Sequence, residues 1–125
     1  MNALLWVFQI LLALHTLMGA VWKVTNSEQS VPSLSALPHA AWLALIGVEV
    51  LCAVGLVLPA LVKPLAKFAL VAAAALVVEM LLFSVLHLAS GSTQHGEMIY
   101  WLVVAGFAGF IAVGRWKSLA AAKAA

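Results

Sequence analysis

Charged side chains are scarce in this sequence. Only 8% of its 125 residues are charged, whereas 66% are hydrophobic and the mean hydropathy is +1.18. A soluble domain carries about a quarter of its residues as charges and is about half apolar. The chain therefore has too little polar surface to cover a water-soluble globule, which excludes a soluble enzyme. Lipid must cover most of the surface instead.

Two further shortages exclude two kinds of chemistry. The formal net charge is only +2, from six basic and four acidic residues, which is too thin and scattered to follow a phosphate backbone. Nucleic acid is therefore not an expected partner. The single cysteine, Cys52, cannot form an internal disulfide, a CxxC redox pair or a cysteine-only zinc site. Because it lies in an apolar run, we interpret it as a small buried side chain.

Four long apolar runs make up most of the chain. At about 1.5 Å of rise per residue, a helix of about 20 residues crosses a hydrocarbon core of about 30 Å. Strands would need the alternating polarity of a barrel, which these runs lack. The sequence therefore predicts an all-α integral membrane four-helix bundle, with residues 1–125 as one transmembrane domain and the first run retained as a helix. The predicted spans are about 3–24, 40–58, 64–88 and 98–114.

The basic residues predict how the bundle is oriented. An even number of spans places both termini on one side of the membrane, together with the loop from Pro59 to Pro64. Lys23 alone lies at the opposite face, and by the positive-inside rule the side richer in Lys and Arg is the cytoplasm. We therefore expect a multi-pass protein of the inner cell membrane, N-in and C-in. The cytoplasmic basic residues would be Lys63, Lys67, Arg115, Lys117 and Lys123.

Aromatic and small residues add two expectations about the helix surfaces. Trp and Tyr are enriched at the two membrane–water interfaces, and small residues are enriched where membrane helices contact each other. Gly47, Gly55 and the small residues between Ala105 and Ala112 are assigned to helix packing, and those of the last span fit a homo-oligomer contact equally well. The expected belt residues are Trp22, Trp42, Tyr100 and Trp101 on the outer side and Trp116 on the inner side.

Two carboxyl groups lie where lipid makes them costly. Glu49 and Glu79 fall near the middle of the second and third spans. An ionised carboxylate at the bilayer centre costs about 2.5–3.5 kcal/mol on insertion scales. Each must therefore be neutral, paired, or facing water or a ligand, and His15 is the nearest candidate partner by depth.

Helical spacing extends these groups into a polar track. Glu79, Phe83 and His87 recur every four residues, which places them on one helical face. His15, Gly19 and Lys23 repeat that spacing on the first span. The track would run from mid-depth to an outer mouth formed by Lys23, His87, His95 and Glu97. His39 and His95 themselves are expected in loops, mostly solvated.

Four interpretations of this track remain open on the residues alone. The polar groups could join the helices by hydrogen bonds and ion pairs. They could line a pocket for a lipophilic, polar-headed ligand such as a quinone, since His and Glu can bond its oxygens and exchange its protons. They could hold a transition metal or haem, although they lie on separate helices without a tight HxxH or ExxH motif. They could also form a proton or ion pathway.

The second span carries a family resemblance. The stretch from Ala44 to Pro59, with its central glutamate, its Gly55-Leu56 pair and its closing proline, resembles the second helix of the DoxX-like family. The likeness extends back to Gly19-Ala20-Val21-Trp22-Lys23 and forward through the Ala-rich third run to His87, and so covers most of the chain. Glu79 and the tail from Lys117 to Ala125 do not match the family pattern.

The resemblance implies a four-helix membrane bundle and several functions. Members of the wider group are similar to subunits of quinone-reducing thiosulfate oxidation systems, to partners in membrane redox complexes, or to assembly chaperones. Our leading hypothesis is a subunit of membrane redox chemistry, working with a membrane redox partner, that binds a quinone-like ligand in an intramembrane polar cavity. The alternatives are a non-enzymatic assembly subunit and a metal- or haem-binding membrane protein.

Each candidate ligand-binding residue has an expected role in that hypothesis. Glu49 and Glu79 would hold or relay protons, His15 and His87 would bond the ligand head, and Lys23 would neutralise charge near the mouth. The family likeness carries over to Lys23 and Glu49, and to His87 less directly. The sequence identifies no catalytic residue.

Overall fold

Four membrane-length helices make up most of the computed structural model, which describes residues 2–31, 34–58, 67–91 and 95–124. The helices are α1 (Asn2–Thr25), α2 (His39–Val57), α3 (Lys67–Ala89) and α4 (Gly96–Ala124), and η1 (Glu28–Ser30) is a short 3-10 helix. All four α-helices are long and apolar enough to cross a membrane. The predicted all-α four-helix bundle is confirmed.

Two predicted helix boundaries are not confirmed by the structure. The loop from Pro59 to Pro64, with Lys63, and the start of the third span at 64–66 lie outside the described residues. His39, which we expected in a loop, instead begins α2, so that expectation was wrong. Pro38 holds an extended backbone (φ −59°, ψ 144°), and its carbonyl accepts a hydrogen bond from the Trp42 N–H at 3.2 Å, so the helix begins directly after it.

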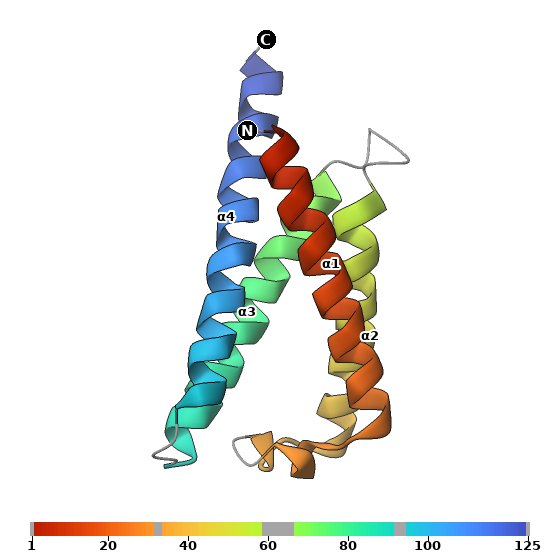
Figure 1. Ribbon diagram of the computed structural model, residues 1–125, viewed down its shortest axis with the longest axis vertical. Helices are drawn as coiled ribbons and strands as arrows, with labels where there is room; N and C mark the ends of the chain where they lie inside the picture. Colours follow the sequence, from red (N-terminus) through yellow and green to blue (C-terminus); the bar gives the residue numbers. More distant parts are fainter. Residues whose placement is uncertain (1, 32–33, 59–66, 92–94, 125) are drawn as a thin grey trace.

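The helices are arranged as two antiparallel pairs (Figure 1). α1 packs most extensively on α2 and α3 on α4, while α2 joins α3 and a smaller contact joins α1 to α4. Both chain termini lie at the end of the bundle where α2 ends and α3 begins, and the connector between α1 and α2 lies at the opposite end (Figure 1). We call these the terminal end and the connector end.

Apolar side chains and close helix approaches hold the bundle together. Gly55 of α2 faces α3 so closely that an added Cβ would lie 3.2 Å from the Ala72 Cβ and 3.3 Å from the Phe68 carbonyl oxygen. Its assignment to packing is therefore confirmed. Gly47 and Gly106 have no such neighbour within 4 Å among the described residues, so their assignment to packing within one bundle was wrong.

A polar contact joins three helices near the terminal end. The fully buried Gln9 of α1 donates from Nε2 to the Leu56 carbonyl oxygen of α2 at 2.7 Å. The Arg115 guanidinium of α4 donates to Gln9 Oε1 and lies 5.1 Å from the centre of the Trp6 ring. Because a buried amide must find partners, this contact fixes the relative positions of α1, α2 and α4.

The aromatic residues divide into exposed and buried sets. Trp22, Tyr100 and Trp116 are exposed, as interfacial residues are. Trp42 and Trp101 are buried inside the bundle, at 1% and 7% exposure, so they do not face the headgroups and the expected belt role was wrong for both. Their indoles pack inside the bundle at the connector end instead.

Candidate functional site

A buried ion pair joins α1 to α2. Lys23 Nζ lies 2.7 Å from Glu49 Oε1, and both side chains are less than one-tenth exposed. Side chains lean toward the N-terminus of their own helix. Because α1 and α2 are antiparallel, Lys23 leans back into the bundle and Glu49 leans toward the connector end, and the two meet. Sequence depth alone pointed to His15 as the partner of Glu49, and that expectation was wrong.

Aromatic rings enclose the Lys23 ammonium. Nζ lies 5.5 Å from the ring centres of both Trp42 and Phe83, within cation–π range. The Trp42 indole N–H donates to the Lys23 carbonyl oxygen at 3.1 Å, which fixes the indole against the end of α1. Both rings are almost completely buried. The ammonium is therefore held in a sheltered position rather than extending into water.

Glu79 completes a cluster of three charges. It is 4% exposed, and it interacts electrostatically with both Glu49 and Lys23. With both carboxyl groups ionised, neither Glu79 oxygen nor Glu49 Oε2 has a hydrogen-bond donor among the described residues. A proton on either carboxyl group would supply the donor that these oxygens lack. The cluster thus holds two carboxyl groups against one ammonium.

An aromatic pocket opens beside this cluster. We call it the outer pocket; it has a volume of about 290 Å³ and lies between the connector and the helices at the connector end. Lys23 is one of its walls, so the ammonium is the link between the pocket and the two buried carboxyl groups. It is lined by Trp22, Lys23, Ser30, Val31, Leu34, Trp42, Phe83, Glu97 and Trp101.

His87 lies behind the wall of the outer pocket. The predicted face of α3 is confirmed as buried, since Glu79, Phe83 and His87 are each less than 5% exposed. His87 Nε2 lies 3.0 Å from His95 Nδ1, and the His87 ring lies edge-on to Trp101 at 6.2 Å. His95 lies just before α4 and is exposed, as expected of a loop histidine, and it also bonds to a buried partner.

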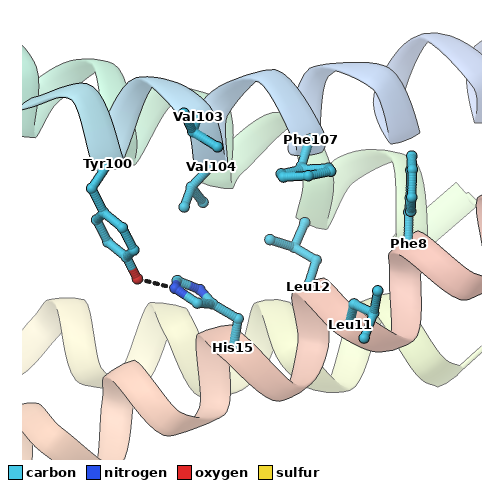
Figure 2. A pocket seen from close by; sticks show the side chains of 8 residues that line it. All are labelled: Phe8, Leu11, Leu12, His15, Tyr100, Val103, Val104 and Phe107. Atoms are coloured by element: carbon cyan, nitrogen blue, oxygen red, sulfur yellow. Dashed lines mark hydrogen bonds between the residues drawn. The ribbon is translucent and has the colours of Figure 1, made fainter.

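His15 lies apart from the charged cluster, in a groove between α1 and α4. Its Nε2 hydrogen-bonds the hydroxyl of Tyr100, and the two side chains reach toward each other from the two helices (Figure 2). The groove has a volume of about 270 Å³ and its other walls are apolar. His15 interacts electrostatically with Lys23 and Glu49. The apolar walls are Phe8, Leu11, Leu12, Val103, Val104 and Phe107.

The described side chains do not assemble a metal site. In residues 2–31, 34–58, 67–91 and 95–124, no group of three or more His, Cys, Asp or Glu side chains is placed to hold a metal ion. Three of the four histidines have partners in two separate places: His87 and His95 bond each other, and His15 bonds Tyr100. The described donor set therefore does not fit a protein-held metal centre.

The fold and the cluster define a small multi-pass membrane protein with charged side chains buried inside its bundle. The model of the DoxX-like family matches residues 7–112, which is most of the chain, and the chain belongs to that family. The resemblance seen in the second span is thereby confirmed. Neither the curated proteins nor the solved structures gave a match.

Proposed function

We propose that this DoxX-like protein binds the head of a quinone-like molecule in the outer pocket and serves a membrane redox complex as a subunit. The observation that carries the proposal is the Lys23 side chain, which lines an aromatic pocket while its ammonium is bonded to the buried Glu49 carboxylate. An ammonium has three donors, and Glu49 accepts from one of them. A ligand carbonyl in the pocket would accept from another.

The surrounding side chains suit a flat ring with oxygens at its edge. The indoles and Phe83 offer stacking surfaces, and Glu97 offers an acceptor for a hydroxyl group. When a quinone is reduced its oxygens take up protons. Reduction to the quinol takes up two protons; Lys23 would donate them one at a time, and Glu49 with Glu79 would return one to Lys23 after each transfer. The electrons would come from the membrane redox partner with which this subunit is proposed to work.

The histidines take different roles from those first expected. His87 supports the Trp101 wall through its ring contact and so acts as a positioning residue. His15 bonds Tyr100 and lines the separate groove, so we do not assign it to the ligand head in the outer pocket. The proposed ligand-contacting residue from the sequence set is therefore Lys23, backed by Glu49 and Glu79.

Tryptophan fluorescence can test binding in the outer pocket. We expect a short-chain benzoquinone to quench the fluorescence saturably, and Trp22→Ala to weaken binding about two- to tenfold, because one aromatic wall is lost. Trp22 is 45% exposed, so the change leaves the core intact. The matched control is Trp116→Ala, which removes an exposed tryptophan of α4. Equal affinities in the two variants, or no saturable quenching in wild type, would refute the assignment.

A second candidate function has its own supporting observation. The Lys23–Glu49 ion pair joins two helices, as a purely structural lock would, and Gly106 presents an open backbone surface on α4 to a partner or a second copy. Under that alternative the protein assists the assembly of a partner complex. Glu49→Gln keeps shape and hydrogen bonding: assembly should survive it, whereas proton-coupled ligand chemistry should fail.

We also propose that the terminal end faces the cytoplasm, as the positive-inside rule predicts. In intact cells, a membrane-impermeant maleimide should label Gln29→Cys and should label Ser118→Cys only after lysis. Both positions are exposed, and the native Cys52 is buried and gives little background. Labelling of Ser118→Cys in intact cells, with Gln29→Cys protected, would reverse the orientation.

A further inference from the structure

The two buried carboxyl groups lie at the same depth below the connector end. Glu49 is ten residues after His39, where α2 begins, and Glu79 is ten residues before Ala89, where α3 ends. At about 1.5 Å of rise per residue, each lies about 15 Å from the connector end of its helix. Any proton that this pair gains or loses must therefore cross part of the bundle.

An apolar layer separates the carboxyl pair from the terminal end. On that side the described residues place the buried Gln9, which bonds the Leu56 carbonyl oxygen. Leu56 is seven residues beyond Glu49 on α2, so about 10 Å of helix separates the two. The core side chains of this layer, each at most 6% exposed, are Leu12, Cys52, Leu56, Ala73, Leu76 and Ala108. Because a close-packed apolar interior does not hold water, this layer is a barrier to protons.

The outer pocket offers a polar route on the opposite side. The Lys23 side chain lines the pocket, and its Nζ lies 2.7 Å from Glu49 Oε1. Glu97 and Ser30 line it too; both are exposed, and Glu97 is the second residue of α4. With these polar lining residues and a volume of about 290 Å³, the pocket can hold water. It therefore connects the aqueous phase at the connector end to the buried pair.

Two other titratable side chains near the pair do not extend this route. Cys52 interacts electrostatically with Glu49 and Glu79, but it belongs to the apolar layer. His15 interacts with Glu49 and Lys23, and it is ten residues from the connector end of α1, at the depth of the pair. It lies in the groove whose walls, apart from His15 and Tyr100, are apolar (Figure 2). Neither side chain leads to an aqueous surface.

We propose that the outer pocket is also the proton route of the carboxyl pair, and that Glu97 exchanges protons with water at its mouth. Lys23 passes its proton to a carboxylate of the pair and takes another from the pocket, and the reverse steps release it. Protons for a bound ligand then come from the connector-end side of the membrane. The inference rests on the proposed proton storage by Glu49 and Glu79, but not on a quinone being the ligand.

Deuterium exchange of the buried carboxylic acid tests the route. Protein in mixed micelles, where both ends of the bundle meet water, is mixed with D₂O, and the shift of the infrared carbonyl band is followed in time. Val31→Phe and Ser30→Phe each add a ring at the pocket wall. Both should slow the shift about tenfold, because exchange then waits for local opening of the protein. Ala36→Phe, at an exposed connector position outside the pocket lining, is the control and should exchange like wild type.

Glu97→Gln tests the residue at the mouth. The amide keeps the size of the side chain but carries no exchangeable acid proton, so exchange should slow about threefold. Added imidazole, a mobile proton carrier, should restore the rate, which it would not do for a structural defect. An unchanged rate in Glu97→Gln, or a slow rate that imidazole does not restore, would overturn the role of Glu97.

The filled variants decide the route itself. Exchange as fast as wild type in both Val31→Phe and Ser30→Phe, or a wild type without the carbonyl band, would overturn the proposal. Quenching by benzoquinone in wild type separates this outcome from that of the proposed function. Slow exchange in the filled variants, with no benzoquinone binding in wild type, would uphold the proton route and reject the quinone.

Discussion

Lys23→Met is expected to lower the free energy of unfolding by about 3–5 kcal/mol, because it leaves two buried carboxyl groups without their cation. Lys23 Nζ lies 2.7 Å from Glu49, and both groups are buried, so little solvent screens the loss. Unfolding of the purified protein in mixed detergent micelles measures the change. Lys67→Met, which removes an exposed lysine at the terminal end, is the control and should change stability little.

The double variant Lys23→Met/Glu49→Leu distinguishes the loss of the whole ion pair from the loss of one of its members. Replacing both members of a buried ion pair by apolar residues is often close to neutral, because no charge is left unpaired. We expect the double variant to recover most of the stability lost in the single one, while binding of quinone to the outer pocket stays lost. If the single variant were as stable as wild type, the buried ion pair would not exist in the membrane.

Glu79→Leu is expected to act in the opposite direction on stability. Glu79 is a second buried carboxyl group beside a single ammonium: ionised, it has no hydrogen-bond donor among the described residues, at a cost of about 1–3 kcal/mol, and to avoid that cost it must take up a proton. Leucine of similar size removes that cost and leaves the Lys23–Glu49 pair balanced. Unfolding in mixed micelles should therefore show unchanged or higher stability than wild type, and Glu97→Leu, at an exposed position, is the control.

Glu79→Leu should also remove a protonated carboxyl group from the interior of the protein. Wild type should show the infrared carbonyl band of a protonated carboxylic acid, sensitive to deuterium exchange, and Glu79→Leu should lack it. A variant that is stable but has lost this band places Glu79 in proton storage. A variant that unfolds readily and binds quinone like wild type would make Glu79 a structural residue instead.

The sequence predicted the scaffold well because the bilayer imposes strong constraints on it. Long apolar runs must be helices in lipid, and the cost of burying a carboxyl group in lipid is enough to single out Glu49 and Glu79. The four-residue spacing also placed Glu79, Phe83 and His87 on one buried face. These inferences depend on the local periodicity of the sequence and on its hydrophobicity, and both can be read from the sequence alone.

The pairing of side chains could not be read in the same way. Lys23 lies close to the end of its helix, and only the antiparallel arrangement and the lean of both side chains bring it to Glu49. The tryptophans of the outer pocket were assigned to interfacial belts because a buried and an interfacial indole give the same pattern near the end of a span. Tyr100 paired with His15 because the first and last helices meet, which no sequence spacing shows.

Our proposal that the buried charges around Lys23 serve a bound lipophilic molecule, rather than packing alone, depends on the lysine side chain that lines the outer pocket. Its most direct test is to extract the protein from native membranes in mild detergent, purify it, and identify co-extracted small molecules by mass spectrometry. We predict a quinone at close to one molecule per chain, displaced when a short-chain benzoquinone is added. A preparation free of quinone that also fails to bind the benzoquinone on titration would contradict the claim.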